Sequence, residues 1–564
     1  MTRLTDYLIE KISPSRLDPF GLGQLTWKYW RNVLRNPGEV MVQNITLAAD
    51  QARLLSYAMQ RSLGMNAEEI IQPAGGDRRF KDSAWSEQLL FDVIKQSYLL
   101  TSRYFLDLAG AAHLDRQQQR KLDFLTRQFV DALSPSNFAV SNPEVLRATI
   151  DSKGANLARG MKNLARDLAA GKGRLRISMV DDSQFEVGKN IATTPGKVVF
   201  ENDLMQLIQY APSTDQVFKT PLVIFPPWIN KFYILDLAPH NSFIRWAVGK
   251  GYTVFIVSWV NPDTKLAHKT FEDYMNEGIF AALDAIEAAT GERVVNAIGY
   301  CIGGTLLACA LSQMAITGDD RIRSTTFFTT QVDFSEAGDL TVFTDEYQLK
   351  SLEKTMKKRG YLDASEMATT FNMLRANDLI WTFVVNNYLL GRSPAAFDLL
   401  YWNNDSTRMP VAMHTFYLRN MYLENRLAEP GGITLNGLPV DLRKVTIPIF
   451  LQSSKEDHIA PYPSVYKATR LYSGPVTFML AGSGHIAGVI NPPEANKYFH
   501  YTSDRLPPDV EDWIETAEYH EGSWWPYWHQ WLYRKSGRKV AARIPGDGAL
   551  PAIEDAPGRY VTMK

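Results

Sequence analysis

Residues 294–314 read VVNAIGYCIGGTLLACALSQM, and this stretch decides the fold. Its first residues are apolar apart from one Asn and end at Gly299, as in a strand buried on both faces. From residue 306 onward it consists mostly of helix formers. The intervening Gly-Tyr-Cys-Ile-Gly-Gly therefore predicts a sharp turn that presents Cys301 at the carboxyl edge of a sheet.

Short apolar segments recur on both sides of this stretch. They are rich in β-branched or aromatic residues, and helical stretches separate them, which is typical of parallel strands covered on both faces. The sequence therefore predicts an α/β domain. The segments are 222–225, 252–259, 294–298, 325–329, 448–451 and 476–480.

The chain before this region has a different pattern. Apolar residues recur at helical spacing, for example at Trp85, Leu89 and Val93, and Gly, Pro and Asp then interrupt the pattern over 171–197. We expect a helical N-terminal domain over 1–180 and an α/β domain over 181–564.

An insertion interrupts the strand pattern over about 335–440. It is rich in aromatic residues, and long insertions in α/β enzymes often cover the active site, so it predicts a lid. A further packed subdomain is the alternative. The aromatic residues are Trp381, Phe383, Tyr388, Phe397, Tyr401, Trp402, Phe416, Tyr417 and Tyr422.

Composition excludes several classes of protein. With 60 Lys and Arg against 61 Asp and Glu, the chain has no excess positive charge for nucleic acid. Its two cysteines form neither a disulfide framework nor a metal motif. Residues 1–17 lack the apolar core of a secretory signal, and no apolar run approaches the roughly 18 residues of a transmembrane helix. We expect a cytoplasmic protein without metal or cofactor.

Three residues form a candidate catalytic set. Glycines flank Cys301 because a nucleophile on a strained turn leaves no room for neighbouring side chains. A thiol needs a base, and His485 follows the last predicted strand; Asp457 follows the strand before it. The chain order of nucleophile, acid and histidine is that of α/β-hydrolases.

Alternatives to this set are open at the sequence level. Cys301 could be a buried structural cysteine, and Glu456 and Asp378 are rival carboxylates. His458 could be a second base, although adjacent residues on an extended segment face opposite sides. Gly482 to Gly488 loosely imitates a dinucleotide loop, but no acidic strand end follows about 20 residues later.

Backbone amides complete the predicted site. The N–H of Ile302 would face the reacting oxygen, and the loop 225–231 after an early strand would supply a second donor near Trp228 or Ile229. A separate cluster of tryptophans predicts core packing of a C-terminal helix, with contact to an apolar polymer as the alternative. These are Trp524, Trp525, Trp528 and Trp531.

Several long motifs stand out in the chain: FPPWINKFYILDL at 225–237, GYCIGGT at 299–305, EDHI at 456–459, GHIAGVINPP at 484–493, GSWWPYW at 522–528 and APGRYV at 556–561. Together they resemble the polyhydroxyalkanoate synthases, and chain length with GYCIGG resembles their class I, which acts without a second synthase subunit. The resemblance extends from about residue 80 to the C-terminus; residues 1–80 match only loosely. Trp228 departs from it, because a smaller residue is expected there in many relatives, which bears on pocket shape.

The resemblance implies polymerisation of (R)-3-hydroxyacyl-CoA into intracellular polyester, with CoA as leaving group and no cofactor. It implies that Cys301 carries the acyl chain and His485 is the base. Asp457 would either orient His485 or deprotonate the 3-hydroxyl. It also implies a homodimer on polyester granules. The alternatives are a thioesterase or depolymerase with the same triad, and a noncatalytic granule-coating protein.

Overall fold

The computed structural model describes residues 22–35 and 37–564, so the prediction about a signal sequence at 1–17 lies outside the described residues. The chain divides into two compact units. One holds the described residues up to Asp181 together with Thr369–Ala396, and the other holds Asp182–Ala368 and Phe397–Lys564. None of the described helices is long and apolar enough to cross a membrane.

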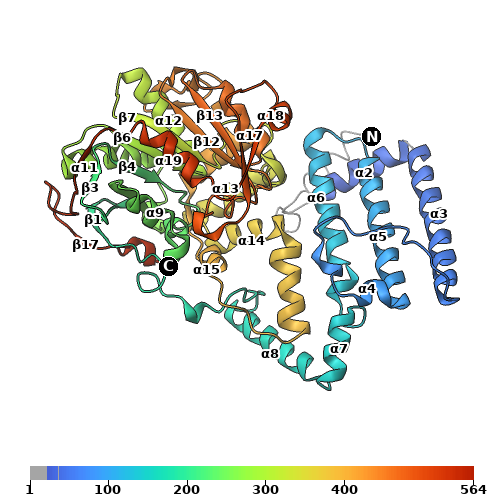
Figure 1. Ribbon diagram of the computed structural model, residues 1–564. Helices are drawn as coiled ribbons and strands as arrows, with labels where there is room; N and C mark the ends of the chain where they lie inside the picture. Colours follow the sequence, from blue (N-terminus) through green and yellow to red (C-terminus); the bar gives the residue numbers. More distant parts are fainter. Residues whose placement is uncertain (1–21, 36) are drawn as a thin grey trace. The chain divides into compact units, whose positions relative to one another are not determined.

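The first unit is helical, and α3, α5 and α6 stand side by side in it (Figure 1). Side chains define where several helices begin: Asp115 accepts the N–H of Gln118 at α6, and Asn142 accepts that of Glu144 at α7. The helices are α2 (Leu22–Arg35), α3 (Pro37–Ser62), α4 (Ala84–Glu87), α5 (Leu89–Gly110), α6 (Arg116–Ala132), α7 (Pro143–Asp151) and α8 (Ala155–Ala170).

The second unit is built on an eleven-stranded sheet with the strand order β15-β14-β13-β12-β7-β6-β4-β5-β2-β1-β17. The six strands from β13 to β5 run parallel, and they correspond to the six apolar segments expected from the sequence. The strands are β1 (Gly196–Glu201), β2 (Met205–Tyr210), β4 (Leu222–Phe225), β5 (Val254–Trp259), β6 (Val295–Tyr300), β7 (Ile322–Phe328), β12 (Ile449–Ser454), β13 (Val476–Ala481), β14 (Phe499–Thr502), β15 (Glu518–Glu521) and β17 (Glu554–Asp555).

Short strand pairs lie outside this sheet. They are β3 (Gln216–Phe218) with β16 (Lys539–Ala541), β8 (Tyr361–Leu362) with β9 (Met409–Pro410), and β10 (Thr434–Leu435) with β11 (Leu438–Pro439).

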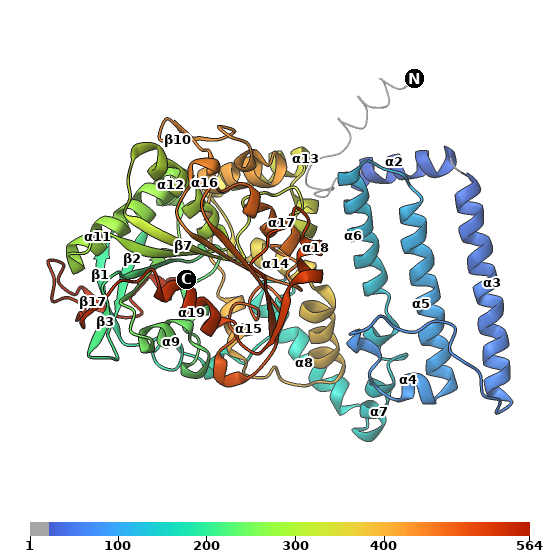
Figure 2. The ribbon, with the colours of Figure 1, turned by 45° about the horizontal axis from the view of Figure 1, so that its top comes forward.

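Helices cover both faces of the sheet, with α11 and α12 on one side and α9 and α19 on the other (Figure 2). The second unit thus has the layered architecture predicted from the sequence. Its helices outside the insertion are α9 (Phe243–Gly249), α10 (Phe271–Asp273), α11 (Ala281–Thr290), α12 (Ile302–Thr317), α17 (Tyr462–Lys467), α18 (Val510–Thr516) and α19 (Trp525–Tyr533).

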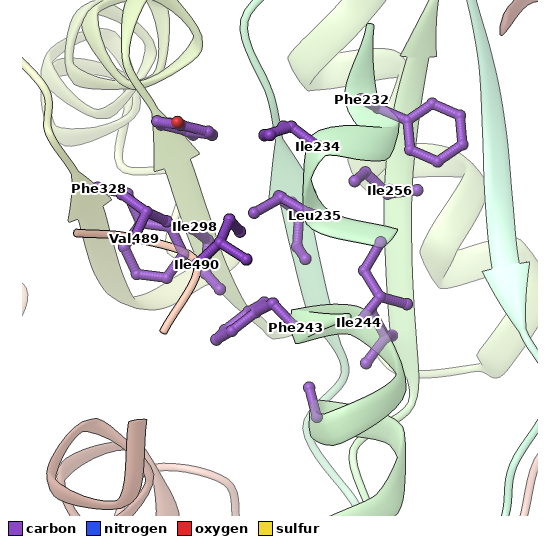
Figure 3. Packing of buried hydrophobic residues seen from close by; sticks show 14 of the residues in the cluster. Phe232, Ile234, Leu235, Phe243, Ile244, Ile256, Ile298, Phe328, Val489 and Ile490 are labelled. Atoms are coloured by element: carbon purple, nitrogen blue, oxygen red, sulfur yellow. The ribbon is translucent and has the colours of Figure 1, made fainter. Parts of the chain in front are cut away.

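The main core lies between the sheet and the layer of α9 and α19. Leu235 and Phe243 lie opposite Ile298 and Ile490 there (Figure 3). Burial of each such side chain contributes about 1.5–3 kcal/mol.

The tryptophan cluster of α19 belongs to this core. Trp524, Trp525 and Trp528 are fully buried, and Trp531 packs against the same core, where its ring contacts Phe450. The four residues are therefore core packing, as the simpler of the two sequence interpretations had it.

The insertion differs from the sequence prediction in one respect. We expected all of 335–440 to belong to the α/β domain, but Thr369–Ala396 packs with the helical unit. The physical reason is a set of polar contacts to α8, described below. The helices of the insertion are α13 (Glu346–Arg359), α14 (Ala364–Leu374), α15 (Asp398–Asn404) and α16 (Val411–Tyr417), with π-helical turns at Asn377–Trp381, Val384–Leu389 and Leu418–Leu423.

Candidate active site

Cys301 stands in the turn between β6 and α12, partly buried, with φ 52° and ψ −126°. This backbone conformation is unfavourable for a residue with a side chain, and such strain is characteristic of functional turns. The N–H of Cys301 donates to Phe328 O at 2.9 Å, which fixes the turn to the neighbouring strand. The strand, turn and helix are therefore arranged as the sequence predicts.

The three glycines around Cys301 each lie where a side chain would collide. A Cβ at Gly299 would lie 2.4 Å from Gly304 Cα, and a Cβ at Gly304 would lie 2.0 Å from Thr330 Oγ1. A Cβ at Gly303 would lie 2.3 Å from the carbonyl oxygen of Phe225. The glycines thus allow α12 to pack directly against β6, β7 and the loop after β4.

His485 and Asp457 meet beside this turn. The ring Nδ1–H donates to Asp457 Oδ2 at 2.7 Å, and the carboxylate side chain is completely buried. Its other oxygen, Oδ1, accepts the N–H groups of Ile459 at 2.8 Å and Ala460 at 2.9 Å. Asp457 is therefore held from both sides and fixes the orientation of the ring.

The electrostatics of His485 link it to Cys301. Burial alone lowers the pKa of the ring, but the negative charges of Asp457 and Cys301, with hydrogen bonds to both, raise it to about 10. The protonated form of the ring is thus stabilised where it hydrogen-bonds to Cys301. A thiolate is the form of cysteine that acts as a nucleophile.

The rival residues lie elsewhere. Glu456 is exposed, and Asp378 belongs to the helical unit, where Arg375 pairs with it at 2.8 Å. His458 is half-buried next to Asp457, but the ring that binds the carboxylate is that of His485. Cys309 is buried within α12, and burial raises its pKa to about 12, which leaves an unreactive thiol.

The predicted oxyanion donors lie on two segments that touch. Ile302 is the first residue of α12, where N–H groups have no partner within the helix. Ile229 lies half-buried in the loop after β4, which contacts the first turn of α12 through Gly303. The roles of both amides remain predictions.

Residues of the insertion hold that loop in place. Trp402 Nε1 donates to Lys231 O at 2.7 Å, and Thr407 Oγ1 donates to Trp228 O at 2.5 Å. The ring of Trp228 itself is buried against Trp259, with ring centroids 5.6 Å apart.

Two tyrosines that sequence reasoning did not assign to the site interact electrostatically with Cys301. Burial raises the pKa of Tyr417 and Tyr422; Tyr422 raises that of Tyr417 further, and a negative charge on Cys301 raises both. Their hydroxyl groups hydrogen-bond to each other and stay protonated. Both were visible as aromatic residues of the insertion, but nothing in their spacing connects them with Cys301.

The loop that carries His485 is anchored by the tryptophan cluster. Trp524 Nε1 donates to Gly488 O at 2.7 Å, and Trp525 Nε1 donates to Val489 O at 2.9 Å. Among the described residues, no group of three or more His, Cys, Asp or Glu side chains could hold a metal ion.

Comparison with known proteins agrees with this architecture. Residues 76–247 match the family model described as the N-terminus of poly-beta-hydroxybutyrate polymerase (PhaC), and residues 221–492 match that of the alpha/beta hydrolase fold. A poly(3-hydroxyalkanoate) polymerase of Methylorubrum extorquens is 52% identical over 94% of this chain and 88% of its own length. The chain belongs to the poly(3-hydroxyalkanoate) polymerase family.

Other members of this polymerase family are similar over most of their length. The polymerase subunit PhaC of Rhizobium meliloti is 51% identical over 95% of this chain and 87% of its own, and that of Cupriavidus necator is 44% identical over 86% and 83%. The hydrolase match spans β4 to the loop after β13 and contains Cys301, Asp457 and His485. The predicted fold class, an α/β-hydrolase domain preceded by a helical region, is confirmed.

Proposed function

We propose that this chain is an acyltransferase that polymerises (R)-3-hydroxyacyl-CoA, with short-chain substrates such as (R)-3-hydroxybutyryl-CoA, into polyhydroxyalkanoate. The observation that carries the proposal is the charged contact of Cys301 with His485 at the end of β6, with Asp457 fixed behind the ring. The names of the relatives supply the substrate class. CoA is the leaving group, so the scheme requires no cofactor.

Acylation begins with attack of the Cys301 thiolate on the thioester carbonyl. The carbonyl oxygen becomes an oxyanion, which the N–H groups of Ile302 and Ile229 would stabilise. The bond to the CoA sulfur then breaks, and the protonated His485 gives its proton to the departing thiolate. One thioester replaces another, so the bond energies nearly balance.

Elongation uses the same histidine in the opposite sense. Once Cys301 carries an acyl group its negative charge is gone, and one of the contributions that raise the His485 pKa disappears with it. The ring becomes a better general base, and it takes the proton of the attacking 3-hydroxyl group. The new ester forms as the bond to Cys301 Sγ breaks, and the thiolate and protonated ring are restored.

Asp457 fits an orienting role in this scheme. Both of its oxygens already accept hydrogen bonds, from His485 and from two backbone amides, and its side chain is fully buried. A substrate hydroxyl would therefore have to reach a carboxylate that is closed off from solvent. We therefore assign deprotonation of the 3-hydroxyl to His485.

Polymerisation rather than hydrolysis demands that water be kept from the acyl-enzyme. Tyr417 and Tyr422 of the insertion interact electrostatically with Cys301, which supports its role as a lid. A thioesterase or depolymerase would use the same triad and differ in its product, and a noncatalytic coat protein would need no triad.

Association with polyester granules in the cytoplasm is part of the proposal. One face of α3 supports it, because Met41, Ile45, Leu55 and Met59 recur at helical spacing and are each more than half exposed. Cosedimentation with polyester granules, compared between the native chain and Leu55→Glu, tests this contact. The homodimer rests on the family resemblance alone, and sedimentation velocity tests it.

The deciding experiment incubates the protein with (R)-3-hydroxybutyryl-CoA and follows both free thiol and acyl product, with Cys301→Ala and His485→Gln alongside. Thiol release with high-mass polyester, absent in Cys301→Ala and reduced by several orders of magnitude in His485→Gln, is the expected result. Thiol release with monomeric 3-hydroxybutyrate would mean a thioesterase. Binding to granules without any thiol release, also with longer acyl chains, would mean a coat protein.

A further inference from the structure

Residues 369–396 leave the insertion and pack into the helical unit, against α8 (Figure 1). The chain enters this segment through α14 and leaves it directly before α15. Both flanks belong to the catalytic unit, so the segment is a covalent bridge from the N-terminal helices to the insertion.

One face of α8 is built to bind this segment. Asn156, Gly160, Asn163 and Asp167 follow each other at intervals of four, three and four residues, which places them in one row along the helix. A row at this spacing usually carries apolar side chains. Here it carries two amides, a carboxylate and a glycine.

The amides of this row bind the backbone of the segment. Asn156 Nδ2 donates to Leu389 O at 2.8 Å, and Asn163 Nδ2 donates to Asn387 O at 3.0 Å. In return, Asn387 Nδ2 donates to Ser178 O at 2.7 Å. Because Asn156 and Asn163 bind backbone carbonyl groups, these two contacts fix the path of the main chain and do not depend on the side chains at the bonded positions.

Asp167 closes the row with a buried carboxylate. Its side chain is 1% exposed. It accepts Tyr388 Oη at 2.7 Å and both the hydroxyl, at 2.7 Å, and the N–H, at 3.0 Å, of Ser178. Burial alone raises its pKa, but these hydrogen bonds together lower it, so the group stays ionised and keeps all three donors bound.

Gly160 lets the two backbones touch. A Cβ at this position would lie 1.8 Å from Tyr388 O and 2.5 Å from its carbonyl carbon. Gly391 on the segment has the reciprocal contact, with a Cβ position 2.4 Å from Asn156 O. Contacts this close leave no room for slippage of the segment along α8.

The chain that follows the segment holds the loop after β4. Trp402 in α15 donates to Lys231 O, Asp405 pairs with Lys231 Nζ at 3.0 Å, and Thr407 donates to Trp228 O. These are the residues on either side of Ile229. The anchored segment is therefore continuous with the part of the insertion that touches the proposed oxyanion loop.

We propose that the row Asn156, Gly160, Asn163 and Asp167 of α8 is a positioning surface: by anchoring 369–396, it keeps α15 seated on the loop 228–231 and keeps water out of the acyl-enzyme. The inference rests on the proposed function, since it concerns the partition of the acyl-enzyme between polymer and hydrolysis. It assigns the N-terminal unit a part in catalysis without any contact with substrate.

Gly160→Ala tests this anchor. Alanine has a higher helix propensity than glycine, so α8 itself should be retained. The added Cβ would keep the row of α8 from approaching Tyr388. Gly38→Ala is the matched control, because it is a helical glycine of the same unit with nothing within 4 Å of its Cβ position. Both variants are compared with the native chain in hydrogen exchange, alkylation of Cys301, and product analysis with (R)-3-hydroxybutyryl-CoA.

For Gly160→Ala we expect exchange over 369–407 to accelerate about tenfold or more, with helix content retained. The share of free 3-hydroxybutyrate among products should rise about threefold or more, because a loosened lid admits water. Cys301 alkylation should accelerate as well, since a loosened lid also admits the reagent. Gly38→Ala should match the native chain in all three.

Faster exchange confined to 369–396, with 397–407 and the product ratio unchanged, would overturn the inference. If Gly160→Ala does not fold, Tyr388→Phe, which removes only the hydroxyl bound to Asp167, must shift exchange over 397–407 and the product ratio in the same direction. If it shifts neither, the inference is wrong. Absence of polymer from the native chain would refute the proposed function, whereas the exchange over 397–407 would still decide the anchor.

Discussion

Replacement of Asp457 by Asn removes one charge behind His485 and keeps the shape of the side chain. The His485 pKa stands at about 10 against an ordinary 6.5, a difference that corresponds to about 5 kcal/mol at roughly 1.36 kcal/mol per pKa unit. Burial lowers this pKa, and the charge of Asp457 is the largest of the contributions that raise it. Without that charge, the pKa should fall toward its ordinary value.

The expected loss of activity follows from these values. At pH 7.5, a ring with a pKa of about 10 is protonated by about 300 to 1, whereas one with a pKa of 6.5 is protonated in about one molecule in ten. The amide also stops selecting the Nδ1–H tautomer, and the same exchange in Ser-His-Asp enzymes costs about 10⁴ in kcat. We expect kcat for CoA release to fall by about 10³ to 10⁴ with little change in KM.

The assay is steady-state CoA release, supported by NMR titration of the His485 ring, which His485→Gln identifies. Glu456→Gln is the matched control, since this neighbouring carboxylate is exposed. In the native chain, the raised His485 pKa contributes stability that is complete below about pH 6.5 and is lost as pH rises through about 10. Urea denaturation should show this loss in the native chain and not in Asp457→Asn.

Retention of activity within about tenfold in Asp457→Asn would refute the reasoning, because no neutral partner can maintain the protonated ring. A large loss in Glu456→Gln with a normal Asp457→Asn would move the acid to the neighbouring residue. A His485 pKa near 10 in both proteins would show that another group supplies the charge.

Three further changes test other parts of the structure. Gly304→Ala should lower CoA release by about 10² and destabilise the fold by about 1–3 kcal/mol in urea denaturation, because its Cβ would overlap Thr330. Gly249→Ala, with open space at its Cβ position, is the control and should do neither. A fully active Gly304→Ala would contradict the packing of α12. Tyr422→Phe should slow single-turnover acylation about tenfold or more, because it removes a hydroxyl that interacts electrostatically with Cys301, and an unchanged rate would assign the tyrosine a packing role only. Burial lowers the pKa of His414 to about 4, so as pH falls from about 6.5 to 4 only the unfolded state takes up a proton at this residue. Over this interval His414→Gln should therefore lose about 3 kcal/mol less unfolding free energy than the native chain. Parallel profiles of unfolding free energy against pH for the two proteins would show that His414 is not the group responsible.

The parallel part of the sheet could be predicted because its strands are continuous apolar runs. The segments 222–225 and 476–480 coincide with β4 and β13 almost to the residue. The flanking antiparallel strands escaped prediction. In β2, Gln206 and Gln209 are buried polar residues, and Gln206 is satisfied by Glu201 and by the N–H of Tyr560. Polar partners such as these, one of them 354 positions away in sequence, leave no trace in an apolar pattern.

The candidate site divides in the same way. Cys301, Asp457 and His485 could be proposed because each follows a recognisable strand, and the contact between Asp457 and His485 is as expected from chain order. Tyr417 and Tyr422 could not be proposed, because their electrostatic interaction with Cys301 depends on how the helices and π-helical turns of the insertion fold. The binding of 369–396 to α8 depends on single polar atoms that no hydrophobic pattern reveals.

The pairing of β1 with β17 has a consequence for how the chain is made. Lys197 and Asp555, which form an ion pair across these strands, are 358 positions apart in sequence. Until the later strand has been synthesised, one edge of β1 is open, and unpaired strand edges readily pair with other chains. Contacts of such long range also form slowly. Yield in the cell should therefore depend on chaperones that shield unfinished chains more than on the stability of the finished protein.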